Sequence, residues 1–212
     1  LDPHNSTALA NFAVQRVVYD TLVVQDRNGE IVPGLAESWE VIDELTIRFH
    51  LRSGVKFSNG AELTAEDVLF SLQRATTEKG SASMFSSFDA ENSEVIDPLT
   101  IDIRVKQPFA AIYNYLASAR GDIICKGALE EMGAEAYGRS PVGTGPFVLT
   151  EWKTGDSLVL TRNENYWGSK PAYEKLTVRV ITEAANRSIE LETGGVDIIY
   201  DVAANDVERL ES

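Results

Sequence analysis

The sequence is poor in the residues that several common protein functions require. Its 212 residues include one cysteine, Cys125, and two histidines, His4 and His50. One cysteine cannot form an internal disulfide, and the sequence has no His or paired-Cys pattern with the spacing of a zinc site. A Ser-His-Asp hydrolase is disfavoured, because only two histidines are available as its base and no G-x-S-x-G element is present. We expect no catalytic residue, no metal ligand and no cofactor.

Positive charge and long apolar runs are also scarce. The chain has 19 Lys and Arg against 33 Asp and Glu, which gives a net charge of -14. This balance argues against nucleic acid as a partner, because binding to phosphates requires a basic surface. No apolar run approaches the roughly 20 residues of a membrane-spanning helix. With 43% hydrophobic and 25% charged residues, the composition is globular and sufficient for a sizeable core.

Local patterns predict a mixture of helices and strands. The segment Leu45–Leu51 alternates apolar and polar residues, which is typical of a half-buried β-strand. Thr64 and Asp67 have the spacing of a capping box, which predicts that a helix begins there and runs to Thr76. The Ser-rich stretch 79–92 shows little periodicity and is predicted to be a loop.

Further elements follow from the same rules. We expect a helix within 8–22 capped by Ser6 or Thr7, a turn at 27–29, strands at 95–96 and 101–105, helices at 109–117 and 126–137, a hairpin of 147–151 with 158–162, and a helix beginning near 205. The order strand, helix, strand at 176–181, 183–193 and 197–202 predicts a βαβ unit with parallel strands.

Three separated motifs carry a family resemblance. The first spans residues 35–68 and includes LAESW, the alternating strand, LRSGVKF, SNG and LTAEDV; the second is GTGPF at 143–147, and the third is RNENYWG at 162–168. In this order, they resemble the family 5 bacterial extracellular solute-binding proteins, the dipeptide-, oligopeptide- and nickel-binding receptors of ABC importers. The resemblance covers essentially the whole chain.

The resemblance implies the architecture. It predicts an α/β (mixed α+β) fold like lobe I of a periplasmic binding protein, with a discontinuous main domain built on a mixed sheet. Residues 1–33 and 143–212 would form the main domain, and residues 34–142 would form a smaller inserted α+β subdomain. Family members are longer and carry a second lobe, so we expect a fragment of the N-terminal lobe.

The resemblance also implies the function. It predicts a monomeric receptor that captures a peptide, metal chelate or similar small solute outside the cytoplasmic membrane and delivers it to ABC permease subunits. The receptor would be periplasmic or lipid-anchored at the cell surface. Two alternatives from other classes stay open: a hydrolase that uses an enclosed pair of carboxylates with shifted pKa values, and a non-catalytic interaction module that docks through unpaired sheet edges.

Five residues are candidates for contact with the solute. Thr7 and Asn11 are four residues apart and share one helix face, which the resemblance places toward the ligand. Arg120 follows an apolar helix, and its planar guanidinium suits a carboxylate; a pair with a surface acid is the alternative. Met84 and Phe85 resemble a side chain that covers the solute in relatives, although a loop anchor packed against the subdomain explains them equally well.

Overall fold

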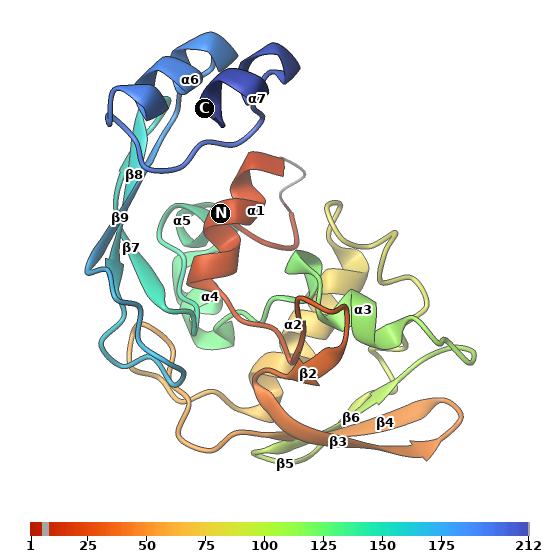
Figure 1. Ribbon diagram of the computed structural model, residues 1–212. Helices are drawn as coiled ribbons and strands as arrows, with labels where there is room; N and C mark the ends of the chain where they lie inside the picture. Colours follow the sequence, from red (N-terminus) through yellow and green to blue (C-terminus); the bar gives the residue numbers. More distant parts are fainter. Residues whose placement is uncertain (6–8, 212) are drawn as a thin grey trace.

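The computed structural model describes residues 1–5 and 9–211 (Figure 1). Its helices are α1 (Leu9–Val18), α2 (Ala65–Thr77), α3 (Ile112–Leu116), the 3-10 helix η1 (Ala119–Gly121), α4 (Lys126–Met132), α5 (Ala134–Arg139), α6 (Ala184–Glu192) and α7 (Ala204–Leu210). Its strands are β1 (Val23–Gln25), β2 (Ile31–Pro33), β3 (Ala36–Asp43), β4 (Thr46–Leu51), β5 (Glu94–Asp97), β6 (Thr100–Arg104), β7 (Phe147–Lys153), β8 (Ser157–Arg162) and β9 (Lys175–Arg179). The chain therefore has the mixed α and β content that its sequence predicts.

A four-stranded antiparallel sheet in the order β3-β4-β6-β5 forms one side of the molecule, with α2 packed against β5 and β6 (Figure 1). The alternating strand is confirmed as β4, in which Ile47, Phe49 and Leu51 are buried. Strand β3 was not predicted. Most of its residues are exposed, so its sequence lacks the alternation that marks a half-buried strand.

The predicted capping box at the start of α2 is confirmed. The backbone N–H of Thr64 donates to Oδ2 of Asp67 at 3.0 Å. The other oxygen of Asp67 accepts the backbone N–H of Lys126 at 3.0 Å. One carboxylate therefore both begins α2 and holds the start of α4 beside it.

The predicted helix at 126–137 is divided into two. Gly133 has a φ of 78°, in the left-handed region that glycine adopts without steric cost, and it separates α4 from α5. The loop expected at 79–92 is confirmed as a series of turns, and the hairpins at 23–33 and 94–104 form as antiparallel pairs.

The second large sheet is antiparallel and has the order β7-β8-β9. Its β7–β8 hairpin is the predicted one. The expected βαβ unit is wrong, because residues 197–202 after α6 form no strand and every strand pair in the described residues is antiparallel. A strand requires a partner for its backbone groups, and here Ile198 and Tyr200 are 74% and 69% exposed instead of packed on a sheet. The mixed sheet that the resemblance implied is likewise absent from this part of the chain.

The GTGP motif packs against the end of α1. Gly145 donates its N–H to the carbonyl of Val18 at 2.9 Å, which satisfies one of the free carbonyls at the helix terminus. A Cβ atom at Gly143 would lie 2.1 Å from the same carbonyl oxygen, so only glycine permits this close approach. The motif therefore positions α1 by direct backbone contact.

The third sequence motif meets the second at Asp20, just after α1. Oδ2 of Asp20 accepts hydrogen bonds from Oγ1 of Thr144 at 2.9 Å and from Nε1 of Trp167 at 2.8 Å. The side-chain amide of Asn163 donates to the carbonyl of Gly145 at 2.9 Å. Two motifs that lie about twenty residues apart in the sequence thus form one polar junction around the end of α1.

The core and the surface are distributed unevenly along the chain. Buried apolar side chains run from Leu1 to Leu160, whereas Ser188 is the one buried residue described beyond Asn163. We call residues 1–5 and 9–168 the body, and residues 170–211, with β9, α6 and α7, the C-terminal arm. Figure 1 shows the arm extending from the β7-β8-β9 sheet above α1. Within the described residues, no helix has the length and apolar character needed to cross a membrane.

Candidate functional site

Helix α1 lies between the two halves of the molecule, with β7 on one side and η1 on the other. The guanidinium of Arg120 in η1 sits over the ring of Phe12 in α1, 4.8 Å from its centroid. Asn11 is half-buried beside Phe12, and Arg16 is exposed one turn further along the helix. We call these four residues the α1–η1 face: Asn11, Phe12, Arg16 and Arg120.

Arg120 is held from behind by the first loop of the chain. Its Nη1 donates to the carbonyl of Pro3 at 3.3 Å, and the residue is 8% exposed. A Cβ atom at Gly80 would lie 2.8 Å from that same nitrogen, so glycine allows the Ser-rich loop to approach it. Burial lowers the pKa of Arg120, and the charge of Asp122 opposes this shift. The guanidinium is therefore fixed in direction, with part of its hydration removed.

The loop behind Arg120 is anchored by a buried ion pair. Both oxygens of Asp2 accept hydrogen bonds from Arg74 of α2, at 2.7 and 2.5 Å. Burial raises the pKa of Asp2, but the hydrogen bonds and charge of Arg74 outweigh it, so the pKa is lowered overall. This bidentate pair joins residues 72 positions apart and ties the start of the chain to α2.

His4 completes this anchor as a neutral side chain. Its Nδ1 lies 3.3 Å from Nη1 of Arg74, which can only donate, so Nδ1 is the acceptor. Its Nε2 then carries the proton and donates to the backbone carbonyl of Asp122 at 3.2 Å. Burial, together with the charge of Arg74, lowers the pKa of His4 to about 4. His4 is fully buried, so it supports the loop and does not face solvent.

Two carboxylates, the buried Asp122 and the half-buried Asp20, lie beside the α1–η1 face. Burial raises the pKa of Asp122 well above its ordinary value; the charges of Arg16 and Arg120 oppose this shift and that of Asp20 adds to it. Burial also raises the pKa of Asp20. Oδ2 of Asp122 has no hydrogen-bond partner among the described residues.

An enclosed acid pair with shifted pKa values is what the hydrolase alternative requires, yet this pair is closed to substrate. Asp122 is 1% exposed, and Oδ2 of Asp20 is already occupied by Thr144 and Trp167. Of the acidic runs, Glu190 is paired with Arg179 and Glu192 with Arg209.

The structure brings together only some of the five residues singled out from the sequence. Arg120 and Asn11 belong to the α1–η1 face, whereas Thr7 lies outside the described residues. Met84 is 37% exposed on the Ser-rich loop. Phe85 is 1% exposed and stacks on Phe88 with centroids 4.8 Å apart, which is the packing arrangement that sequence analysis kept as its alternative.

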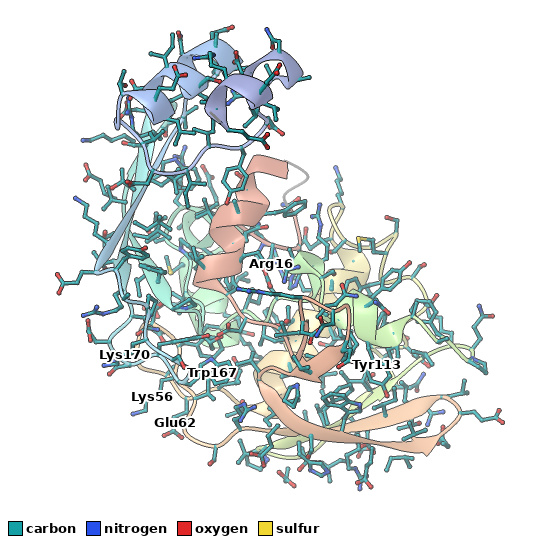
Figure 2. The ribbon with its side chains drawn as sticks, in the orientation of Figure 1. Arg16, Lys56, Glu62, Tyr113, Trp167 and Lys170 are labelled. Carbon is teal, nitrogen blue, oxygen red and sulfur yellow. The ribbon has the colours of Figure 1, made fainter. Side chains whose placement is uncertain are left out.

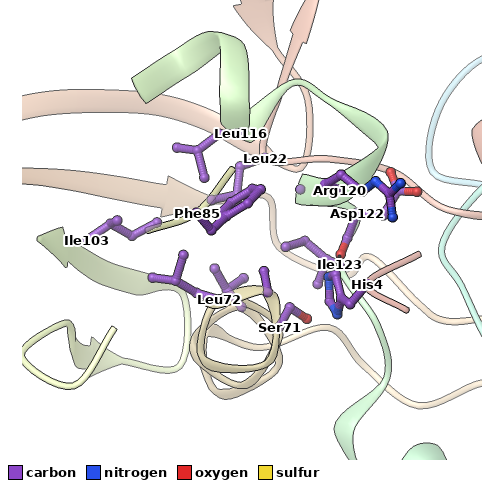
Figure 3. A pocket seen from close by; sticks show the side chains of 13 residues that line it. His4, Leu22, Ser71, Leu72, Phe85, Ile103, Leu116, Arg120, Asp122 and Ile123 are labelled. Carbon is purple, nitrogen blue, oxygen red and sulfur yellow. Dashed lines mark hydrogen bonds between the residues drawn. The ribbon is translucent and has the colours of Figure 1, made fainter. Parts of the chain in front are cut away.

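Figure 3 shows a cavity between α2 and η1, with His4, Arg120 and Asp122 at one end and apolar side chains at the other. Every residue that lines it is buried, including Leu22, Leu72 and Phe85. It is therefore a packing gap inside the core.

The residues that organise this region from a distance were not predicted from the sequence. Asp2, Asp20, Arg74 and Asp122 gain their roles from partners that lie far along the chain. No local spacing marks such pairs. Arg16 was also missed, although its position four residues after Phe12 places both on one helix face and was readable from the sequence.

Comparison with known proteins gives consistent matches. Residues 30–212 match the model for bacterial extracellular solute-binding proteins, family 5 Middle. The glutathione-binding protein GsiB of Salmonella paratyphi A is 33% identical over 205 residues, which are 95% of this chain and 40% of that protein. The chain thus spans about 40% of the length of the curated relatives it matches.

Solved structures agree with the sequence matches. NikA from Brucella suis, in complex with Fe(III)-EDTA, is 34% identical with a TM-score of 0.84, over 98% of this chain and 43% of that one. AgaA from A. tumefaciens R10, in complex with agropinic acid, is 30% identical with a TM-score of 0.90, over 98% of this chain and 43% of that one. The fold is therefore that of the periplasmic binding proteins.

Proposed function

Because the chain belongs to the family 5 bacterial extracellular solute-binding proteins, we propose that it is part of the solute-binding receptor of an ABC importer. The receptor captures a small solute outside the cytoplasmic membrane, in the periplasm or at the cell surface, and passes it to the permease. The observation that carries this proposal is the match of residues 30–212 to the family, together with the α1–η1 face that these residues build.

The solute is a small molecule with at least one carboxylate. The names of three relatives refer to glutathione, Fe(III)-EDTA and agropinic acid, all of which carry carboxylates. On this chain, Arg120 supplies the matching group, since a guanidinium pairs with a carboxylate through two parallel hydrogen bonds. Asn11 adds a polar side chain beside it, and Thr7 and Met84 are further contact residues in this proposal.

The receptor acts without changing its solute. Asp122 is 1% exposed, Oδ2 of the half-buried Asp20 is taken by Thr144 and Trp167, and within the described residues no group of three His, Cys, Asp or Glu side chains is arranged to hold a metal ion. The receptor works as a monomer that meets the permease and has no nucleic-acid partner, in keeping with its net charge of -14.

The division into two domains is part of the same proposal. Residues 34–142 hold the β3-β4-β6-β5 sheet and α2, while residues 1–33 and 143–212 hold α1 and the β7-β8-β9 sheet. Both crossing points pack against the segment at the end of α1: a Cβ atom at Gly34 would touch the carbonyl oxygen of Thr21, and one at Gly143 would touch that of Val18. This supports an insertion between Pro33 and Gly143.

The proposal is tested by measuring solute binding to the chain by NMR titration. The probes are reduced glutathione, an iron–EDTA chelate and, as a neutral control, glucose. We expect saturable shifts with at least one carboxylate-bearing probe and none with glucose, with weak affinity because the chain spans about 40% of its relatives. Arg120→Gln removes the response, whereas Arg104→Gln, on the four-stranded sheet, keeps it. Lack of a response to both carboxylate-bearing probes would contradict the proposal.

A further inference from the structure

Two Asn-Gly pairs in the sequence, Asn28-Gly29 and Asn59-Gly60, carry a chemistry that solute binding does not use. An asparagine reacts with its own backbone when the amide nitrogen of the next residue attacks Cγ of its side chain. A glycine in the next position favours this attack, because the absence of a Cβ atom leaves the nitrogen accessible and the backbone free to turn. Both pairs are therefore candidates for self-modification, and their surroundings differ.

The turn at Asn28 is held by contacts within its own hairpin. It joins β1 to β2, and Asn28 is exposed. Its Nδ2 lies 3.4 Å from Oδ2 of Asp26, longer than an ordinary N–H···O hydrogen bond, and its Oδ1 accepts no hydrogen bond from the residues that the structure describes. The N–H of Gly29 donates to the carbonyl of Asp26 at 3.1 Å. The side chain of Asn28 is therefore free to rotate toward the nitrogen of Gly29.

The side chain of Asn59 is engaged at both of its polar atoms. Its Oδ1 accepts the backbone N–H of Ala61 at 3.1 Å, and its Nδ2 lies 3.9 Å from Sγ of the buried Cys125. Asn59 is half-buried, and the N–H of Gly60 donates to the carbonyl of Phe57 at 2.8 Å. The attacking nitrogen and the attacked side chain are both held more closely here than in the hairpin.

The flanks of the turn at Asn59 are also tied to the rest of the body. The backbone N–H of Ser58 donates to the carbonyl of Gly143 in the GTGP motif at 2.9 Å. Lys56 and Glu62, which Figure 2 labels at the lower edge of the molecule, form an antiparallel bridge across the turn. For ring closure, the side chain of Asn59 would have to leave two contacts while the backbone around it stays fixed.

We propose that Asn28 is a deamidation site of the folded chain and that Asn59, in the same dipeptide, is protected. The backbone nitrogen of Gly29 loses its proton to hydroxide and attacks Cγ of Asn28. The Cγ–Nδ2 bond breaks, and the leaving nitrogen takes a proton from water and departs as ammonia. Water then adds to one carbonyl of the resulting succinimide ring and opens it to aspartate or isoaspartate. Neither turn belongs to the α1–η1 face, so the proposal is independent of solute binding.

The product changes the hairpin in two ways. The new carboxylate stands beside Asp26, whose Oδ1 accepts the N–H groups of Asn28 and Glu30 at 2.8 Å each, so two like charges then occupy one turn. Isoaspartate also adds one carbon to the backbone between β1 and β2, and the register of a hairpin is set by its turn. Deamidation should therefore loosen the pairing of β1 with β2.

The test follows the whole chain in warm, mildly alkaline buffer, with a parallel sample unfolded in urea. Trypsin separates the two sites, because Arg48, Arg52 and Lys56 lie between them, and mass spectrometry then measures the mass gain and isoaspartate content of each peptide. In the folded chain we expect Asn28 to react at least about tenfold faster than Asn59, whose two side-chain contacts must break first. In urea the two sites should react at similar rates.

Asn28→Gln is the matched control. Its longer side chain closes a larger ring more slowly, so the mass gain at this site should disappear while the rate at Asn59 stays the same. Equal rates at Asn28 and Asn59 in the folded chain would overturn the inference, since the contacts of Asn59 would then give no protection. A folded chain in which neither site reacts, although both react in urea, would show that the hairpin protects Asn28 as well. Lack of reaction at Asn28 even in urea would also overturn the assignment.

Discussion

The body and the C-terminal arm of this chain are held together in different ways. In the body, most segments between Leu1 and Leu160 contribute buried apolar side chains, and polar groups such as Asp2, Arg74 and His4 are buried with partners. In the arm, seven large apolar side chains are exposed: Tyr173, Val180, Ile189, Ile198, Tyr200, Val202 and Val207.

Ion pairs follow the same division. The arm is organised by partly exposed pairs such as Arg179 with Glu190 and by Arg187, which donates to backbone carbonyls at Ile181, Thr182, Tyr200 and Asp201. Solvent-exposed ion pairs contribute little to stability, whereas burial of apolar area contributes much. The α1–η1 face is built from residues of the body, so its position should not depend on the ion pairs of the arm.

The largest expected effect is a cavity in the body. Phe85→Ala removes a ring that is 1% exposed and stacked on Phe88, so the free energy of unfolding should fall by about 3–5 kcal/mol. Urea denaturation followed by tryptophan fluorescence measures it. A loss of only about 1 kcal/mol, which is the cost of an ordinary substitution, would show that the body tolerates voids and would weaken the contrast with the arm.

The next effect concerns the buried ion pair. Arg74→Met leaves Asp2 buried without its partner, and we expect a loss of about 3 kcal/mol or more in the free energy of unfolding. Arg179→Met breaks the pair with Glu190 in the arm and is the matched control; it should leave the denaturation midpoint nearly unchanged. Equal losses in the two variants would remove the distinction between buried and exposed pairs.

Lowering the pH should reduce the stability of the body through protonation of His4. Its pKa is lowered to about 4 in the folded chain against 6.5 in the unfolded chain, so the unfolded chain binds a proton first as the pH falls. The contribution of His4 to stability is therefore complete above pH 6.5 and is lost as the pH falls toward 4, by about 3 kcal/mol.

The pH effect is measured as a difference between proteins, because Asp20 and Asp122 titrate in the opposite sense. Their pKa values are raised by burial, so their contribution to stability grows as the pH falls. Denaturation of the unaltered chain and of His4→Gln between pH 7 and pH 4 isolates the imidazole, since the acids are common to both. A slope that His4→Gln does not change would contradict the assignment of His4 as a buried neutral group.

The smallest expected effect lies in the arm. Ile198→Ser replaces a side chain that is 74% exposed and should change the free energy of unfolding by no more than about 0.5 kcal/mol. Ile103→Ser, at a fully buried position of β6, should cost several times more. Thermal unfolding of the two variants side by side makes the comparison. A large loss for Ile198→Ser would mean that the arm is packed as firmly as the body.

Sequence analysis succeeded where the signal is local. The alternation in Leu45–Leu51, the capping box of Thr64 and Asp67 and the β7–β8 hairpin each depend on neighbouring residues, and each formed as predicted. Predictions were incomplete or wrong where the formation of a strand depends on partners far along the chain. β3 is mostly exposed and gives no alternation, and residues 197–202 have the composition of a strand but find no partner.

The same contrast between local signals and distant partners applies to the candidate site. Arg120 and Asn11 were named from the sequence because a family resemblance pointed to them, and in the structure Arg120 contacts Phe12, the residue that follows Asn11 in α1. The anchor behind them was not predictable, because Asp2 and Arg74 are 72 residues apart and Asp20 and Trp167 are 147 apart. A local sequence pattern cannot predict a residue pair that forms only when the chain folds.

The most direct test of the account is a map of where a carboxylate-bearing solute touches the chain. Reduced glutathione is titrated into isotope-labelled protein, and backbone amides together with the side-chain Nε–H groups of arginine are followed by NMR. The account predicts that the largest shifts occur in α1 and η1 and at Arg16 and Arg120. Largest shifts in the C-terminal arm or on the outer face of the four-stranded sheet would contradict it.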